Sequence, residues 1–220
     1  MNIFKWKFSY PITVLIVLLL VTDAGFIFLH IINKLGFISS GYFRLTQDMG
    51  YAEVFQYIKE FWIACLLGII ALRHKAASYV IWSLIFLYLL ADDSLSVHET
   101  GGGLLVEALN IQPALNLRAQ DFGELLVTAI AGGILFSMLF VAYYFATAPT
   151  RHVTHQLLLF VAGLAFFGVF VDMVHSALPF GNFFFGLIED AGEMLIMSVI
   201  VGYCFALIHD HDHKPQTTPH

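Results

Sequence analysis

Long apolar segments alternate with short polar segments along this chain of 220 residues. Six of the apolar segments reach the roughly 20 helical residues that are needed to cross a hydrocarbon core. They lie at approximately residues 9–33, 54–73, 77–98, 122–147, 153–177 and 184–209. A transmembrane β-barrel would instead show segments of about 10 residues with alternating polarity. The pattern therefore predicts an all-α, polytopic membrane protein built as a bundle of six transmembrane helices.

The composition supports this prediction, because 59% of the residues are hydrophobic and only 12% are charged, against about 25% charged residues in soluble domains. We expect a single transmembrane domain over residues 1–209, followed by a polar, histidine-rich tail over residues 210–220. The apolar start resembles a signal peptide but lacks a small-x-small cleavage site, so a retained first helix is favoured over cleavage after about Ala24. The interaction partner that this architecture implies is the lipid bilayer. No basic stripe indicates nucleic acid, and the oligomeric state stays open.

Charge suggests an orientation in the membrane. Arg73, Lys75 and Arg151 lie in short turns that fall on one side of an alternating bundle, and basic residues in short loops favour the cytoplasm. This predicts a bacterial inner-membrane protein with both termini cytoplasmic. Of the 16 acidic residues, only Asp210 and Asp212 then lie at the cytoplasmic end. The others form an acidic outer side, either as a cation-attracting vestibule or as ordinary solvated loops.

Four acidic segments stand near the outer ends of the predicted spans. They are EVFQYIKE (53–60), DDSLSVHE (92–99), VDMVH (171–175) and EDAGE (189–193). Ionisable groups at membrane depth are costly, so they tend to pair, to bind a ligand or to line a water-filled path. In an alternating bundle all four segments fall on the same side, which predicts that they share one site.

Glycines suggest where the third span ends and how the fourth span packs. Three glycines at 101–103 are expected to end the third span, because glycine disfavours a helix interior. The apolar segment after them, interrupted by Pro113, is then expected to lie along the outer interface as a lid. In the fourth span, Ala129, Gly132 and Gly133 form a small-residue stretch that predicts close helix packing.

Histidines and carboxylates that converge from four helices predict a metal site. Carboxylate dimetal proteins use a similar ligand composition, and mixed imidazole and carboxylate ligands suit divalent zinc, iron or manganese. Glu53 or Glu99 is expected to act as the general base or to orient a ligand. A lipid or other amphiphile is the expected substrate, because the site lies at the membrane border. The expected metal ligands are Asp93, His98, Asp172, His175, Glu189 and Glu193.

Three alternatives stay open from the sequence. The same carboxylates and histidines can form a proton or cation pathway in a transport protein. His98 and His175 can serve as the two axial ligands of a haem electron carrier. The third alternative is that these residues are helix-end groups satisfied by caps and interfacial water.

Two resemblances bear on function. The Ser94-x3-His98 pair resembles membrane hydrolases related to alkaline ceramidases and adiponectin receptors, which implies a zinc-dependent hydrolase. Those proteins are seven-helix bundles with an intramembrane His-x3-His segment, and this chain has six spans and no such segment. It is more similar to uncharacterised multi-pass bacterial membrane proteins that carry a D-D-x-x-S-x-H-E segment, here 92–99, and a late E-D-x-x-E segment, here 189–193. That resemblance names no activity.

Overall fold

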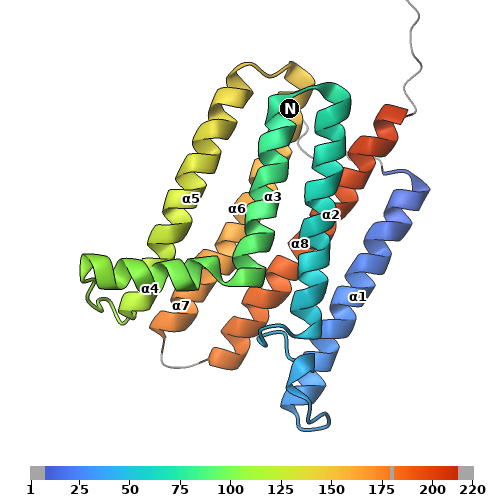
Figure 1. Ribbon diagram of the computed structural model, residues 1–220. Coiled ribbons are helices and arrows are strands. Elements are labelled where there is room, and N and C mark those ends of the chain that lie inside the picture. Colours follow the sequence, from blue (N-terminus) through green and yellow to red (C-terminus); the bar gives the residue numbers. More distant parts are fainter. Residues whose placement is uncertain (1–7, 179–180, 213–220) are drawn as a thin grey trace, which may run out of the picture.

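A computed structural model describes residues 8–178 and 181–212 of the chain and shows a bundle of long helices, with no strand among the described residues. Six helices are long and apolar enough to cross a membrane, so the predicted all-α, six-span fold is confirmed (Figure 1). The first five spans end within a few residues of their predicted positions. The elements are α1 (Tyr10–Lys34), η1 (Gly41–Phe43), α2 (Tyr51–His74), α3 (Ala77–Leu95), α4 (Val97–Leu109), α5 (Ala119–Tyr144), α6 (Ala148–Ala165), the π-helical η2 (Phe166–Val171), α7 (Asp172–Ala177) and α8 (Asn182–Asp212).

The fifth span is a composite of three segments. It runs as α6, passes through the π-helical turn η2 and finishes as α7. Single π-turns inside α-helices are rare and occur frequently at functional sites. Here the π-turn directly precedes Asp172, so it sets the direction in which the last turn of this span presents its acidic and imidazole side chains.

The hydrophobic core lies where α2, α3 and α8 pack together. Apolar runs on these helices leave several side chains fully inaccessible, among them Ile63, Trp82, Phe86 and Ile200. By contrast, α1 and α5 expose most of their apolar surface. In a spanning helix such exposure is to lipid, so these two helices form the lipid-facing flanks of the bundle.

Helix α4 corrects the expectation that the three glycines end a helix. The third span stops earlier, at Leu95, and Ser96 takes a left-handed conformation with φ 49°. The glycines 101–103 then lie inside α4, which lies across one end of the bundle (Figure 1). Gly102 packs against Gly123 of α5, where a Cβ atom would meet the Glu124 nitrogen at 2.7 Å. The glycines therefore allow α4 and α5 to touch, and glycine's weak helix propensity is outweighed by that packing.

The small-residue stretch of α5 does not pack as predicted. A Cβ atom on Gly132 would meet only Phe136 of the same helix, at 3.9 Å, and one on Gly133 would meet nothing within 4 Å. No atom of a neighbouring helix lies within 4 Å of either Cβ position, although α3 contacts α5 nearby through Trp82 and Phe136. The two glycines instead border open space.

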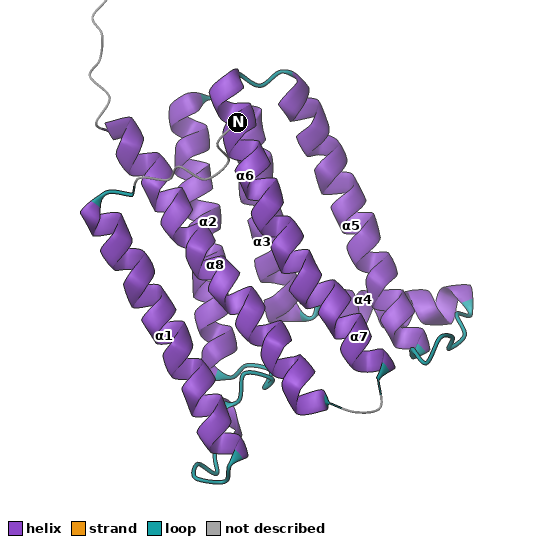
Figure 2. Cartoon of the chain, turned by 180° about the vertical axis from the view of Figure 1, so that it is seen from behind, coloured by secondary structure: helices purple, strands orange, loops and turns teal. Residues whose placement is uncertain are grey.

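The two ends of the bundle differ in character. The start of α1, the end of α8 and the α2–α3 and α5–α6 turns lie at one end, as Figures 1 and 2 show. The acidic segments lie at the other end, together with α4, α7 and the loop that follows α1. The tail predicted to begin at residue 210 starts within α8, whose backbone continues to Asp212, and residues 213–220 lie outside the described part of the chain. Lys5, Lys7 and Lys214 also lie outside it.

Candidate functional site

A cavity of about 970 Å³, called the outer cavity below, opens at the acidic end of the bundle. Its walls come from the loop after α1 and from α2, α3, α4, α5, η2, α7 and α8. The four acidic segments thus meet at one place, as their spacing along the chain predicted. All eight residues predicted to form the site line this cavity: Glu53, Asp93, His98, Glu99, Asp172, His175, Glu189 and Glu193.

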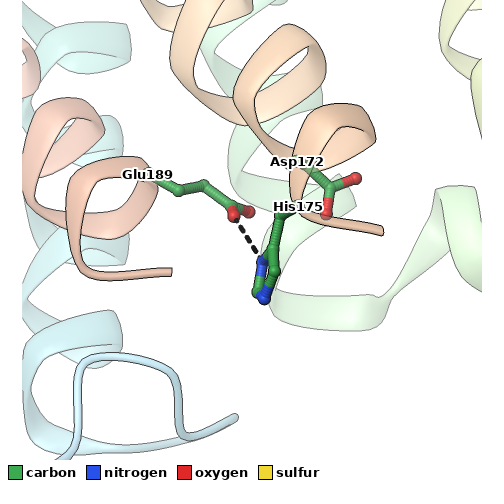
Figure 3. Close-up of side chains that lie close together, drawn as sticks. All are labelled: Asp172, His175 and Glu189. Atoms are coloured by element: carbon green, nitrogen blue, oxygen red, sulfur yellow. Dashed lines mark hydrogen bonds and ion pairs between the residues drawn. The ribbon is translucent and has the colours of Figure 1, made fainter. Parts of the chain in front are cut away.

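Three of the six predicted metal ligands form a compact group. Possible ligand atoms of Asp172, His175 and Glu189 all lie within 4.8 Å of one another, and His175 Nδ1 is 3.4 Å from Glu189 Oε2 (Figure 3). Asp172 and His175 stand one turn apart on α7, and Glu189 reaches them from α8. The group is partly accessible from the cavity, so a ligand can reach it from the aqueous side.

The imidazole ring of His175 is oriented by its neighbours on α8. The ring of Phe185 stacks on it, with 6.4 Å between ring centroids and 23° between ring planes. A Cβ atom on Gly186 would come within 3.5 Å of His175 Cε1, so the glycine leaves room for the ring. These contacts hold the ring between the start of α8 and the carboxylate of Glu189.

The other three predicted ligands, Asp93, His98 and Glu193, lie elsewhere in the same cavity. The carboxyl group of Asp93 is hydrogen-bonded to that of Glu60 from α2. Glu193 of α8 lies close to both. Two carboxyl groups share a hydrogen bond only if a proton lies between them, so this deeper group holds at least one proton unless a cation replaces it.

His98 has its own partner. It lies in α4, outside the spanning helices, and its Nδ1 is 3.2 Å from Asp92 Oδ2. Its backbone N–H also donates to Asp92 Oδ1 at 2.8 Å. The interaction with the Asp92 carboxylate raises the pKa of His98 above its usual value, although partial burial acts in the opposite direction. His98 is therefore held by Asp92, and among the described residues no group of three possible metal ligands includes it.

The two residues predicted as general bases have different surroundings. One carboxylate oxygen of Glu53 accepts a hydrogen bond from the backbone N–H of Met49, which ties it to the start of α2. Glu99 is exposed on α4 at the cavity wall. Asp190, which stands beside Glu189 and lines the same cavity, has a buried Oδ2 atom without a hydrogen-bond partner. Of these three acids, Asp190 is the one with a buried carboxylate oxygen that has no hydrogen-bond partner.

A second polar group, which the sequence did not predict, lies away from the cavity. Lys59 of α2 is completely buried, and its ammonium donates to Asp23 Oδ1 at 3.1 Å, to the Met194 carbonyl at 2.8 Å and to Ser198 Oγ at 3.3 Å. Ser198 in turn donates to Asp23 Oδ2 at 2.5 Å. Because all three ammonium hydrogens have acceptors, this network is closed, and it joins α1, α2 and α8.

Two features of the sequence could have revealed these missed residues. Asp23 is the only acid in the first span, and Lys59 is the only basic residue in the middle of the second. A single acid and a single base at membrane depth are expected to pair. Glu60 follows Lys59 directly, so the two side chains leave α2 about 100° apart, one toward α1 and the other toward the cavity.

The fold and the cavity define a class: a multi-pass helical membrane protein with a carboxylate- and histidine-lined cavity at one end of the bundle. Within that class, the chain belongs to the family described as a domain of unknown function, DUF8692, whose family model matches residues 13–209. No curated protein and no solved structure matches the chain.

Proposed function

We propose that this protein binds a divalent metal ion at Asp172, His175 and Glu189 and uses it for hydrolase-like chemistry in the outer cavity. The observation that carries the proposal is the approach of one imidazole and two carboxylates from two helices to within 4.8 Å of one another. Zinc, iron and manganese are the ions that such a mixed donor set suits.

The geometry fits such an ion after a small adjustment. Ligand atoms at about 2.0–2.2 Å from zinc in a tetrahedron lie roughly 3.3–3.6 Å apart. The His175–Glu189 separation of 3.4 Å already meets this requirement. The rest of the group needs to close by about 1 Å, a movement that rotation of the Asp172 and Glu189 side chains can supply.

Charge balance also supports a cation. The outer cavity is lined by many carboxylates but by only one arginine, Arg118, and that arginine is held by Asp121, with Nε at 2.9 Å from Oδ1. Carboxylates gathered at a membrane border repel one another unless some are protonated or a cation lies among them. A metal ion at the Asp172 group would neutralise part of this charge.

The chain's own residues divide the chemical work. A bound divalent ion would lower the pKa of a coordinated water to about 7. Asp190 is the proposed proton acceptor, because it lines the same cavity and its buried Oδ2 atom has no hydrogen-bond partner. Phe185 and Gly186 keep the His175 ring in its ligating orientation. The proposed substrate is an amphiphile, since the cavity is at the membrane border, and in the proposed topology the site opens to the extracytoplasmic side of a bacterial inner membrane.

Elemental analysis tests the proposal directly. The protein is purified without residues 210–220, so that the histidines of the tail cannot bind metal. We expect about one equivalent of divalent metal in this protein and a large loss in His175→Ala and in Glu189→Gln, because each removes one of three ligands.

Two control substitutions accompany the test. His152→Ala removes an exposed histidine at the opposite end of the bundle, and Glu107→Gln removes an exposed acid on α4. Both should leave the metal content unchanged. Full metal content in His175→Ala would show that the ion binds elsewhere. A wild-type protein that contains no metal would refute the proposal.

A further inference from the structure

A second cavity, of about 260 Å³, lies deeper in the bundle and adjoins the outer one. Lining residues common to both include Gln56, Asp93, Glu124, Asp172 and Glu193. The deep cavity is bounded mainly by α3, α5, α6 and α8. Any molecule in it therefore has one end beside the proposed metal site and the other end at membrane depth.

The two ends of the deep cavity differ sharply in chemistry. The end that meets the outer cavity carries the acids together with His98. The inner end is lined mainly by apolar residues and glycine, with the hydroxyl-bearing side chains of Tyr88 and Thr128 among them; the apolar and glycine residues are Ile85, Leu89, Gly132, Leu135, Phe136, Val161 and Leu164. Apolar walls do not hold water, which needs several polar partners. A ligand that fills the whole cavity must be amphiphilic.

The inner end is also open toward the side of the bundle. Leu125 and Phe136 of α5 and Ala165 of α6 line the cavity and are exposed at the surface as well. All three belong to spanning helices, so the phase outside them is hydrocarbon. Helices α5 and α6 are joined by a turn at the end of the molecule opposite the acidic end and run side by side (Figure 1). Lipid chains thus reach the cavity without crossing water.

We propose that the deep cavity binds one alkyl chain of a bilayer amphiphile, whose uncharged or cationic headgroup lies at the acidic end. The inference deepens the proposed function by naming its substrate class, and its catalytic consequence rests on that function. Chain binding itself depends only on the apolar walls and the lateral opening.

The preference for headgroup charge follows from the groups that face the polar end. The carboxyl groups of Glu60, Asp92, Asp93, Asp121, Glu124, Asp172 and Glu193 line it, and His98 is the one residue among its lining that can carry positive charge. A phosphate headgroup would meet like charges there. An amine or a hydroxyl can instead donate hydrogen bonds to carboxylate oxygens, and an amine also gains Coulomb attraction.

Photolabelling of the purified full-length protein tests the inference. Three probes share one long alkyl chain with a photoreactive group at its middle and differ only in their headgroups, which are a hydroxyl, a primary amine and a phosphate. We expect saturable labelling of peptides from 125–136 and 161–168 by the alkanol and the alkylamine, and roughly tenfold weaker labelling by the alkyl phosphate. Equal labelling by all three would overturn the headgroup assignment. Labelling that an excess of unlabelled alkanol does not displace, or that spreads over the lipid-facing residues of α1, would overturn the site.

Neighbouring glycines on α5 provide a matched pair of variants. Gly132 lines the cavity, whereas Gly133 is exposed, does not line it and has open space around its Cβ position. Gly132→Leu should fill the cavity and reduce labelling roughly tenfold, and Gly133→Leu should leave it unchanged. Equal labelling of the two variants would overturn the inference. If Gly132→Leu does not fold, Gly132→Ala is expected to give a smaller loss of labelling. Unchanged labelling of Gly132→Ala would count equally against the site.

Metal-stripped protein and His175→Ala separate this inference from the proposed function. Chain labelling that persists in both, while metal binding is absent from the wild type, would leave the chain site standing and remove the metal enzyme. Metal binding without saturable labelling would do the reverse.

Discussion

Lys59 and Asp23 show how strongly membrane depth constrains a single residue. Neither side chain is accessible, and each finds its full set of partners within one network across three helices. Removing one member of a buried charge pair leaves the other uncompensated, which typically costs about 3–5 kcal/mol. The network therefore fixes the positions of α1 and α8 on α2 rather than serving as a site that exchanges ligands.

Lys59→Met should lower the free energy of unfolding by about 3–5 kcal/mol, because Asp23 then lies buried without its cation. Asp23→Leu alone should have a similar effect. The double variant Lys59→Met/Asp23→Leu should lose less free energy of unfolding than the sum of the two single losses, because it leaves no unpaired charge. Unfolding in a detergent titration measures this coupling, and strictly additive losses would show that the two residues do not act as a pair.

The Asp92–His98 pair predicts a pH dependence. The folded-state pKa of His98 is raised above its usual value of 6.5 by the Asp92 carboxylate, so the protonated form is favoured in the folded protein. This contribution is fully present below the unfolded pKa and is lost as the pH rises through the folded pKa. Glu99 and Glu124 face the same imidazole and act in the same direction.

We therefore expect the melting temperature to fall as the pH rises from 6.5 through the raised pKa of His98. The fall should be reduced in His98→Gln and in Asp92→Asn, since neither variant retains the ion pair. Thermal unfolding at a series of pH values provides the measurement. His152→Gln, at the opposite end of the bundle, serves as the control, and an unchanged slope in His98→Gln would contradict the assignment.

At the scale of single residues, the sequence predicted which residues line the cavity but not which of them interact with one another. The eight predicted site residues do line one cavity. The partition into an Asp172 group, an Asp92–His98 pair and a Glu60–Asp93–Glu193 group depends on helix rotation, which residue spacing within each helix does not specify. Glu60 belongs to the acidic segment 53–60, yet only the packing of α2 against α3 shows that Asp93 is its partner.

At the scale of elements, the sequence located the spans well and their ends less well. Long apolar runs set the spans, and each boundary agrees with the structure to within three residues except the start of the fifth span, predicted at residue 153 and found at Ala148. The third span stops at Leu95, three residues before its predicted end. That span was extended to residue 98 because no proline or glycine stands before it. The left-handed conformation of Ser96 ends α3, and serine rarely adopts it. The expectation that the third span continues to residue 98 was wrong for this reason, and His98 lies in α4 instead.

The packing of α4 on α5 leads to a prediction about two adjacent glycines. Gly102→Ala should destabilise the protein by about 1–3 kcal/mol, because its Cβ would press on the backbone of Gly123 and Glu124. Gly103→Ala should be neutral or slightly stabilising, because its Cβ meets only Gln120 Oε1, at 3.6 Å, and alanine favours a helix by about 0.8–1 kcal/mol. Melting temperatures compare the two variants. Equal losses in both would mean that helix propensity, not contact with α5, decides the cost.

At the scale of the whole molecule, the fold was predictable because six apolar runs leave few ways to cross a bilayer. The opening of the deep cavity toward the side of the bundle was not predictable, because small residues in a spanning helix usually indicate close packing. Gly132 and Gly133 instead border open space on α5. The difference arises because α5 packs on α3 through other residues, such as Phe136 against Trp82, and the two glycines take no part in that contact.

The orientation of the molecule in the membrane can now be tested at both ends of the bundle. Arg73, Lys75 and Arg151 stay exposed at the end that the positive-inside rule assigns to the cytoplasm. Lys59 lies toward the acidic end of α2, but it is buried and paired with Asp23, so its charge does not count against that assignment. The acidic cavity then faces outward.

We expect Gln112→Cys, in the exposed segment after α4, to react with a membrane-impermeant maleimide in intact bacterial cells. Lys75→Cys, in the α2–α3 turn, should react only after the cells are permeabilised. The parent protein supplies the background, because Cys65 and Cys204 both lie in spanning helices, away from water. The reverse pattern would invert the molecule, and the outer cavity with its proposed metal ligands would then open to the cytoplasm. In that case the metal and chain sites would keep their geometry, but their substrate would have to come from the cytoplasmic leaflet.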